Sequence, residues 1–323
     1  MHAILVSRTG GPEVLEWTEM PDPVPGDGEL LVAVGAAGIN FIDVYRRSGL
    51  YPVPLPSVPG SELAGRVVAV GAGVAGVAPG DLVATADALG AYGELARVPA
   101  GRAVPVPEGV PAEQAAAVML QGMTAQYLVT DTFPLRAGQR CVVHAAAGGV
   151  GALLVQLARQ LGAEVFATVG SPAKAEVARE AGAQHVIVTS EGDWAARVEA
   201  LAGPKAIDVV YDGIGRETFE RGLDLLRRRG MMVTFGNASG PVEPFAPLAL
   251  GGRGSLFLTR PVLGDYTATT AELRARAGDV LGRVAAGTLA VRVGARFTLA
   301  EAADAHRLLE SRRSIGKIVL TAS

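Results

Sequence analysis

The sequence predicts an α/β protein with two domains, one a doubly wound parallel sheet and the other smaller and mostly β. The chain has 323 residues, and a single hydrophobic core rarely grows past roughly 250 to 300 residues. Up to about Gly122, short apolar runs are separated by Gly and Pro turns, which is typical of antiparallel strands. From about Met123, strand-like runs alternate with amphipathic segments of helix length, the pattern of a parallel sheet with crossover helices.

The second region contains enough predicted strands to complete a doubly wound sheet. They span residues 140–145, 164–169, 185–189, 207–211, 231–235 and 255–259. A helix follows the first strand, because apolar residues from Val150 to Leu161 recur on one face and Gly162 can end it. Another helix is predicted after Ser171, an N-cap residue followed by Pro172 at the first helical position.

Outside this region the predicted strands are shorter. In the first part of the chain they lie at residues 30–34, 65–70, 82–86 and 92–98. Beyond Arg260 we expect a long helix at about 270–286, a strand around 295–299, a helix from about 299 to 311 and a last strand at 317–321.

The composition is that of a globular protein without a strong charge. Apolar residues make up 49% and charged residues 19%, which argues against disorder. A formal net charge of -3 provides no overall positive field to attract nucleic acid or anionic lipid. Cys141 is the only cysteine, so no intramolecular disulfide can form. Since no segment has the pattern of a signal peptide or a membrane span, we expect a cytoplasmic protein.

A glycine-containing turn joins the first strand of the second region to its helix. The segment from Cys141 to Gly151 reads CVVHAAAGGVG, with Ala146 in place of the first glycine of the G-x-G-x-x-G pattern. Gly148 would let the backbone approach a pyrophosphate, and Gly151 would let helix and strand pack closely. The helix N-terminus would offer N–H groups to the anion. Such turns also serve packing alone, but the strand and helix around this one favour dinucleotide binding.

The end of the second strand favours NADPH over NADH. Enzymes that use NAD place an acidic residue there, which accepts a hydrogen bond from the ribose 2′-hydroxyl. This chain has Gly170, Ser171 and Lys174 instead, and a hydroxyl and an ammonium suit a 2′-phosphate. The alternative is that Lys174 is a solvated lysine in the first turn of a helix.

Zinc chemistry is not predicted. A zinc site needs three or four Cys, His or carboxylate ligands, whereas the chain has one cysteine and histidines only at positions 2, 144, 185 and 306. None of these has the usual ligand spacing. Cys141 and His144 are interpreted as residues of the sheet core.

Several segments, spread over almost the whole chain, are specific as a set. They are GGPEVL (10–15), GINFIDVYRRSGLYP (38–52), QGMTA (121–125), AAAGGVG (145–151), VYDGIG (210–215), RGMMVTFGNASG (229–240) and LESR (309–312). Together they resemble the NADPH:quinone oxidoreductases of the zeta-crystallin type, a zinc-free branch of the medium-chain dehydrogenase/reductases. Zinc-using relatives carry a Cys near the position of Asn40 and a His near that of Ser61.

The resemblance implies a fold and a reaction. A GroES-like, mostly β catalytic domain would comprise residues 1–122 and 261–323, and a Rossmann NADPH-binding domain residues 123–260. NADPH would reduce a quinone, by hydride or by single electrons, without a metal or a nucleophilic residue. Asn40, Tyr45 and Tyr51 are candidate catalytic residues that would donate hydrogen bonds to the quinone oxygen, although a tyrosine in this apolar motif can equally be a packing residue.

The resemblance also implies which residues bind the cofactor. The nicotinamide and substrate cleft would be lined by Phe41, Ile42, Asp43, Tyr45, Thr124 and Tyr127. The pyrophosphate would be held by Gly148, Gly149 and Val150, and the adenosine half by Gly170, Ser171, Lys174 and Thr189. The nicotinamide ribose and carboxamide would contact Phe235, Gly236, Asn237 and Ala238, with Arg312 reaching across from the C-terminal segment. Thr189 stands where the family often has a tyrosine, and it cannot stack on adenine as that ring could.

Two other functions stay open. An NADPH-dependent reductase of enones or enals shares the cofactor and the fold and differs in the acceptor. Some zeta-crystallin relatives are lens structural proteins or bind nucleic acid, and Arg227–Arg229 is a basic run, although a solvated helix end is the simpler interpretation. Relatives are commonly homodimers, and the apolar segment from Gly254 to Arg260 is a candidate edge strand for such pairing.

Overall fold

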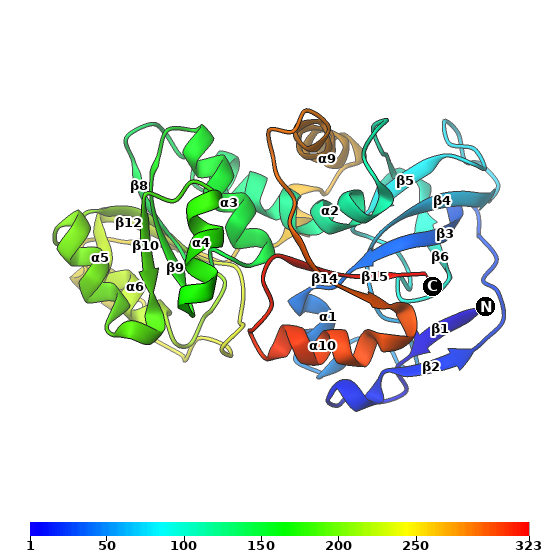
Figure 1. Ribbon diagram of the computed structural model, residues 1–323, viewed down its shortest axis with the longest axis horizontal. Helices are drawn as coiled ribbons and strands as arrows, with labels where there is room; N and C mark the ends of the chain where they lie inside the picture. Colours follow the sequence, from blue (N-terminus) through cyan, green and yellow to red (C-terminus); the bar gives the residue numbers. More distant parts are fainter. Residues whose placement is uncertain (323) are drawn as a thin grey trace. The chain divides into compact units, whose positions relative to one another are not determined.

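The structure of the protein is a computed structural model that describes residues 1–322. The chain divides into two compact units (Figure 1). One comprises Met1–Met123 together with the segment that begins at Thr267, and the other comprises Thr124–Tyr266. Within residues 1–322 we find no helix that combines the length and the apolar character needed to cross a membrane.

The unit Thr124–Tyr266 contains the predicted doubly wound sheet. Its strands are β8 (Arg140–Val143), β9 (Glu164–Val169), β10 (His185–Val188), β11 (Ile207–Asp212), β12 (Leu226–Thr234) and β13 (Phe257–Thr259). They pair in parallel in the order β10-β9-β8-β11-β12-β13. In chain order within the sheet this is 3-2-1-4-5-6, the Rossmann arrangement, which confirms the predicted fold class.

Helices cover both faces of this sheet (Figure 1). The longer ones are α3 (Gly149–Gln160), α4 (Pro172–Glu180), α5 (Trp194–Ala202) and α6 (Phe219–Leu225), with α7 (Leu248–Gly252) and α8 (Leu263–Tyr266) near the end of the unit. Helix α3 buries Leu153, Leu154 and Leu157, as its apolar stripe predicts. Ser171 is the N-cap of α4 with Pro172 in the first turn, so both predicted helices are confirmed.

The other unit contains a sheet in the order β14-β15-β3-β4-β5-β7, with β6 also paired to β3. Its strands are β3 (Glu29–Gly38), β4 (Glu62–Val70), β5 (Leu82–Thr85), β6 (Leu95–Pro99), β7 (Val104–Pro105), β14 (Val293–Thr298) and β15 (Lys317–Thr321), and a separate pair is formed by β1 (His2–Leu5) and β2 (Glu16–Glu19). Strand β15 pairs antiparallel with β3. The end of the chain therefore completes a sheet begun by its first hundred or so residues, as the GroES-like domain implies.

The helices of this unit include α1 (Phe41–Arg47), α9 (Thr270–Ala285) and α10 (Ala302–Glu310), and α2 (Ala112–Tyr127) begins in it. Thr269 and Glu272 form a capping box at the start of α9. The helix expected from about 299 to 311 is divided into a short 3-10 turn, Leu299–Glu301, and α10.

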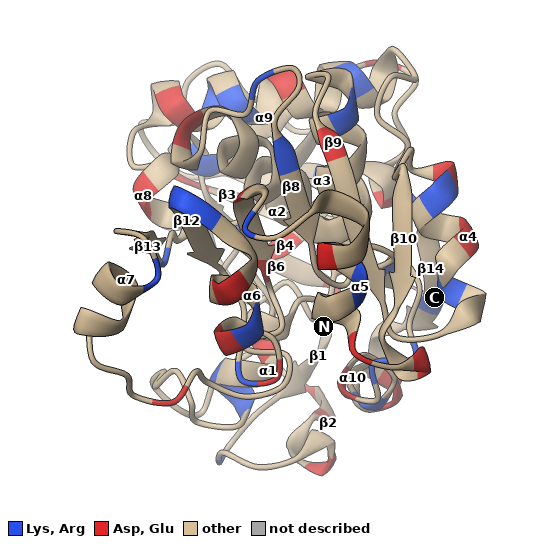
Figure 2. Ribbon diagram, turned by 90° about the vertical axis from the view of Figure 1, so that its left-hand side faces the viewer, with Lys and Arg blue, Asp and Glu red and all other residues tan. Residues whose placement is uncertain are grey.

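One sequence interpretation is wrong. The basic run Arg227–Arg229 is not a helix end, because α6 ends at Leu225 and the run lies in the first half of β12. Arg227 forms an ion pair with Asp208 at 2.6 Å. In Figure 2, segments coloured as acidic and basic alternate along α6, the helix that precedes this run.

Candidate functional site

The turn between β8 and α3 has the geometry of a phosphate-binding turn. A Cβ atom on Gly151 would lie 2.3 Å from the carbonyl oxygen of Ala145, so only glycine fits there. The same oxygen would lie 3.1 Å from a Cβ on Gly148 and accepts a hydrogen bond from the Gly148 N–H at 2.8 Å. Ala145 adopts a positive φ of 51° to make this turn.

Helix α3 presents the N–H groups of its first turn at this turn. The first intrahelical bond runs from the Ala152 N–H to the Gly148 carbonyl at 2.9 Å. Gly149 and Val150 precede it, and backbone N–H groups at these positions have no carbonyl of the preceding turn to bind. The first turn contains no acidic side chain. The site fits the anionic pyrophosphate of a dinucleotide.

The ends of β9 and β10 lie at the same edge of the sheet. Gly170 follows β9, and a Cβ atom on it would have no other atom within 4 Å, so the space beside it is open. The Ser171 side chain makes no capping hydrogen bond. Partial burial lowers the pKa of the Lys174 ammonium, a cost that a nearby phosphate would offset. Thr189 follows β10 as the first residue of a short 3-10 turn.

The loops after β11 and β12 are hydrogen-bonded to each other. Phe235 donates to the Asp212 carbonyl at 2.8 Å, and Ala238 donates to that of Gly213 at 3.2 Å. A Cβ on Gly236 would lie 2.4 Å from the Gly213 carbonyl oxygen, so the two backbones approach as closely as glycine allows. One Asp212 oxygen accepts from the backbone of the first loop and holds it in shape.

These observations bring the predicted cofactor residues of this unit to one edge. Gly148–Val150, Gly170–Lys174, Thr189 and Phe235–Ala238 all follow carboxyl ends of neighbouring parallel strands. The strand order reverses between β8 and β11. Doubly wound sheets bind their ligands outside the carboxyl ends at this point of reversal.

The remaining predicted residues of this unit lie elsewhere. Thr124 and Tyr127 are buried residues of α2. The Tyr127 ring stacks on that of Tyr266, with centroids 4.1 Å apart and planes 7° from parallel. Tyr266 also accepts a hydrogen bond from Thr132 at 2.8 Å. The structure thus gives Tyr127 a packing partner within its own unit.

In the other unit, Asn40 lies at the centre of a buried polar cluster. Its Nδ2 donates to Glu62 at 2.7 Å and to the Gly38 carbonyl at 3.3 Å. Its Oδ1 accepts from Lys317 at 2.8 Å and from Gln121 at 3.1 Å. Both Nδ2 hydrogens are therefore engaged within the protein, and a hydrogen bond from Asn40 to a quinone would replace one of them.

An ion pair completes this cluster. Lys317 Nζ and Glu62 Oε2 lie 2.5 Å apart, with both side chains almost completely buried. The other carboxylate oxygen of Glu62 accepts from the Leu120 N–H at 2.6 Å. Burial lowers the pKa of Lys317, against the attraction of Glu62. Removal of one partner of such a buried pair strongly destabilises a protein, because the remaining charge stays buried without compensation.

A second buried chain of contacts starts at Asp43. Its Oδ2 accepts from the Asn40 N–H at 2.9 Å and from the Tyr92 hydroxyl at 3.1 Å. Tyr92 also contacts His306 Nε2 at 3.1 Å, and His306 Nδ1 contacts Arg47 at 3.1 Å. Asp43 is thus directed into the interior of its unit, and burial raises its pKa to about 6.

The aromatic residues of α1 form a cluster with Tyr51. The Phe41 and Tyr45 ring centroids are 6.0 Å apart, and those of Tyr45 and Tyr51 are 5.3 Å apart in an edge-on arrangement. Tyr45 is 9% exposed and Tyr51 is 37% exposed. Ile42 is partly exposed beside them. Arg312 is exposed and follows the end of α10 with a φ of 56°.

Cys141 and His144 are confirmed as core residues. Burial raises the pKa of the Cys141 thiol. His144 is buried, its Nδ1 lies 2.7 Å from the Thr168 hydroxyl, and burial lowers its pKa. Among residues 1–322, no three His, Cys, Asp or Glu side chains are grouped so that they could hold a metal ion.

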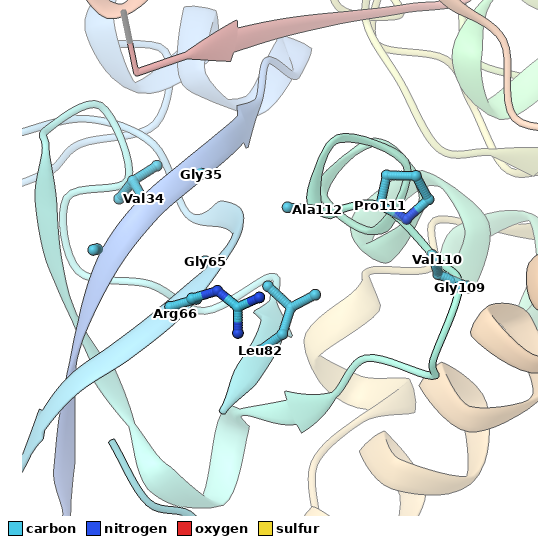
Figure 3. Close-up of a pocket in the computed structure, with 10 residues that line it drawn as sticks. Val34, Gly35, Gly65, Arg66, Leu82, Gly109, Val110, Pro111 and Ala112 are labelled. Carbon is cyan, nitrogen blue, oxygen red and sulfur yellow. The ribbon is translucent and has the colours of Figure 1, made fainter. Parts of the chain in front are cut away.

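Figure 3 shows a surface depression of about 640 Å³ in the unit that contains α1. It is lined by Ala33, Val34, Gly35, Gly65, Arg66, Leu82, Gly109, Val110, Pro111 and Ala112. Its one charged side chain, Arg66, donates to the Gly80 carbonyl at 2.8 Å. Because none of the predicted site residues lines it, we assign it no role in the reaction.

Comparison with known proteins identifies the family. Residues 26–108 match the family described as alcohol dehydrogenase GroES-like domain, and residues 149–273 match the family described as zinc-binding dehydrogenase. A quinone oxidoreductase of Pseudomonas aeruginosa is 48% identical over 96% of this chain and 96% of its own length. The chain belongs to the quinone oxidoreductase family of the medium-chain dehydrogenase/reductases.

Other members of the quinone oxidoreductase family and its neighbours match over almost the full length. The quinone oxidoreductase of Escherichia coli, solved in complex with NADPH, has a TM-score of 0.96 at 42% identity and covers 99% of this chain and 100% of its own. A 2-haloacrylate reductase of a Burkholderia species is 41% identical over 98% of both chains.

The buried partners of Asn40 and Asp43 were not predicted from the sequence. These partners are Glu62, Tyr92 and Lys317, with His306 in contact with Tyr92. One signal was present, because Lys317 is a charged residue directly before the apolar run IVL of the last strand. Another was the spacing of Asn40, Asp43 and Arg47, which places three polar residues on one face of a helix.

Proposed function

We propose that this protein is an NADPH-dependent quinone oxidoreductase. Membership of the family supports this function, and so does the edge of the sheet described above. The single structural observation that carries the proposal is the turn at Gly148–Gly151, since a side chain at Gly151 would fill the turn and the first turn of α3 is free of acidic groups.

The proposed reaction converts NADPH, a proton and a quinone into oxidised NADP and a hydroquinone. Bound NADPH supplies the two electrons that this reduction needs, as a hydride or one at a time. The chain's own contribution is to hold and orient the two reactants and to exclude water. We propose that Gly148, Gly149 and Val150 bind the pyrophosphate, and that Gly170, Ser171, Lys174 and Thr189 bind the adenosine half.

The other site residues are proposals of the same kind. Phe235, Gly236, Asn237, Ala238 and Arg312 would contact the nicotinamide half. Phe41, Ile42, Tyr45, Thr124 and Tyr127 would line the cleft, with Tyr45 and Tyr51 as candidate donors to the quinone oxygen. For Asn40 and Asp43 the buried contacts favour positioning over direct contact. We further propose residues 1–122 with 261–323 as the catalytic domain and residues 123–260 as the NADPH domain.

A titration of both cofactors tests the function. Calorimetry is expected to show tighter binding of NADPH than of NADH, followed by turnover of 9,10-phenanthrenequinone with NADPH. Folded protein that takes up neither dinucleotide would contradict the proposal. The same assay with a simple enone tests the alternative reductase, which the likeness to 2-haloacrylate reductase supports. Faster turnover of the enone than of any quinone would favour it.

We also propose a homodimer in the cytoplasm. Strand β13 is the last strand of its sheet, and Phe257 on it is 55% exposed. An apolar edge of this kind is a natural pairing surface for a second copy of the chain. The formal net charge of -3 and the ion pair of Arg227 with Asp208 give no support to nucleic-acid binding.

A further inference from the structure

Helix α1 carries three buried polar residues on its inner face. Asn40, Asp43 and Arg47 are spaced by three and four positions, which places them along one side of the helix. None of the three is more than 4% exposed. Among their partners, Tyr92, Glu310 and Lys317 come from segments far away in the chain, so the placement of α1 depends on polar contacts as well as on apolar packing.

The direction of one hydrogen-bond chain is fixed by its first member. The Arg47 guanidinium only donates, so His306 Nδ1 must accept and its proton must be on Nε2. Nε2 then donates to the Tyr92 oxygen, and Tyr92 donates its own proton to Asp43 Oδ2. Burial, with Arg47 beside it, lowers the pKa of His306 to about 3, so the ring stays neutral.

The outer end of this chain is anchored. Arg47 donates to both carboxylate oxygens of Glu310, at 3.0 Å and 2.7 Å. This bidentate pair fixes the plane of the guanidinium against α10. Because Arg47 cannot lose its proton, this chain of hydrogen bonds cannot carry protons in from the surface. Its effect is to orient the Tyr92 hydroxyl toward Asp43.

Asp43 is the inner end of this chain of hydrogen bonds, and its two carboxylate oxygens differ in their partners. Oδ2 accepts two hydrogen bonds, whereas Oδ1 is buried and has no partner among residues 1–322. Arg46, Arg47, Glu62, Tyr92, His306 and Lys317 are the titratable or charged groups around it on the neighbouring elements. Since Oδ2 is occupied by two donors, a proton taken up by Asp43 goes to Oδ1.

We propose that ionised Asp43 is a positioning residue that fixes the first turn of α1, and that Tyr92 and His306 are needed to hold its carboxylate in place. The inference rests on the proposed function, in which Phe41, Ile42 and Tyr45 of α1 line the nicotinamide and quinone cleft. A charged acceptor binds the Asn40 N–H about twice as strongly as a neutral one. Protonation of Asp43 weakens this hydrogen bond at the start of α1 and so lowers kcat/KM, even though loss of the buried charge stabilises the fold as a whole.

The pH dependence of kcat/KM tests the inference with the full-length protein. Burial is the main cause of the raised pKa of Asp43, which is about 6, so wild-type activity is expected to fall below that pH. Tyr92→Phe removes a hydrogen bond that lowers this pKa, so the fall moves upward by about half a pH unit. Asp43→Asn is expected to abolish the fall of kcat/KM with pH. Its kcat/KM should equal, at every pH, the low value that wild type reaches at acid pH.

Tyr211→Phe is the matched control. Tyr211 is a buried tyrosine whose hydroxyl donates only to the backbone carbonyls of Leu128 and Phe133. Its loss is expected to leave the pH profile unchanged. A fall that persists in Asp43→Asn, as titration of the cofactor's own phosphate would produce, overturns the inference. So does a profile of Tyr92→Phe that coincides with that of wild type while the circular dichroism spectrum is native.

A readout without turnover separates this inference from the proposed function. Carbon-13 NMR of Asp-labelled wild-type protein is expected to show one carboxyl resonance that titrates near pH 6 and is missing from Asp43→Asn. Absence of that resonance overturns the inference even if quinones are reduced. Its presence in a protein that binds no NADPH at about pH 8 would leave Asp43 as the titrating group and contradict the proposed function instead.

Discussion

Lys174 and Asp43 show the same physical effect in two settings. Desolvation disfavours the charged form of both side chains, so it lowers the pKa of the lysine and raises that of the aspartate. Lys174 lies at the sheet edge, where a bound phosphate would offset its desolvation. Asp43 lies in the interior, where hydrogen bonds from Asn40 and Tyr92 do so in part. One residue is suited to a ligand and the other to the support of a helix.

Lys174→Ala is expected to weaken NADPH binding by about tenfold and to leave NADH binding unchanged. A hydrogen bond to a charged group contributes about 1.5 to 3 kcal/mol, and each 1.4 kcal/mol is about tenfold in affinity. Calorimetry with both cofactors measures the difference. Arg179→Ala is the control, since Arg179 is an exposed cation in the last turn of the same helix and pairs with Glu176. Equal loss of both cofactors would show that Lys174 does not contact the 2′-phosphate.

Asp43→Asn is expected to change how stability depends on pH. In wild type the folded pKa of Asp43 is about 6, above its usual value of 3.8. Between these values the folded state binds more protons than the unfolded one, so the contribution of Asp43 to stability rises as the pH falls. Relative to Asp43→Asn, wild type should gain about 1.4 kcal/mol for each pH unit in this window.

Urea unfolding of both proteins at several pH values between about 4 and 6 measures this difference. His306 acts in the opposite direction, because its folded pKa lies below its unfolded one and stability is lost as the pH falls through that range. The comparison removes this contribution, since both proteins contain His306. A free-energy difference that does not vary with pH would contradict the assignment.

At the scale of elements, two close approaches of the backbone shape the edge of the sheet at which we propose that NADPH binds. The Gly151 backbone lies against Ala145, and that of Gly236 lies against Gly213. In the first case a turn meets the helix that follows it, and in the second the loops after two neighbouring strands meet, closer than any side chain would permit. Helix α1 differs, because its place is set by ion pairs and hydrogen bonds with α10, β4 and β15.

Gly151→Ala is expected to destabilise the protein by about 2 to 4 kcal/mol and to abolish NADPH binding. The added methyl group would lie 2.3 Å from the Ala145 carbonyl oxygen, so the turn or the helix must move. Thermal unfolding and calorimetry measure the two effects. Gly278→Ala is the control, because Gly278 lies within α9 with no atom near its Cβ position, and this change should stabilise by about 0.5 to 1 kcal/mol. Native NADPH affinity in Gly151→Ala would refute the close-approach argument.

At the scale of the whole molecule, the sheet of the unit Thr124–Tyr266 has two end strands, β10 and β13. Strand β13 is short, and Phe257 on it is largely exposed. Natural proteins usually cover such an edge or place a charge on it. A second copy of the chain would cover it, which is why the proposed dimer belongs to this scale.

Light scattering after size-exclusion chromatography is expected to give the mass of a dimer. Phe257→Lys should convert it to a monomer, because a lysine on an edge strand opposes strand pairing. Leu201→Lys is the control, since Leu201 is exposed to the same 55% on α5, away from β13. A wild-type mass of one chain, or a dimer that survives Phe257→Lys, would exclude pairing through this edge.

The sequence alone predicted the fold class, the six strands of the doubly wound sheet, the helices α3, α4 and α9, and the glycine turn, whereas helix α2 and the strands β1 and β2 were not predicted. The predicted features follow from local patterns: a period of two or 3.6, an N-cap with proline, and glycines between a strand and a helix. It also indicated Lys174 as a candidate ligand of the 2′-phosphate, because no acidic residue follows the second strand. Each of these features depends on residues that are close together in the chain.

Which distant residues meet follows from the tertiary structure. Lys317 contacts Asn40 and Glu62 because β15 pairs with β3 beside β4. Tyr92 contacts Asp43, and His306 contacts Tyr92, each across a large separation in sequence. Such contacts leave no periodic signal, since a buried charge is stabilised by whichever partner the fold brings near it. The tertiary structure therefore assigned the inward direction of Asn40 and Asp43, which the sequence had suggested as contacts of the cofactor and the quinone.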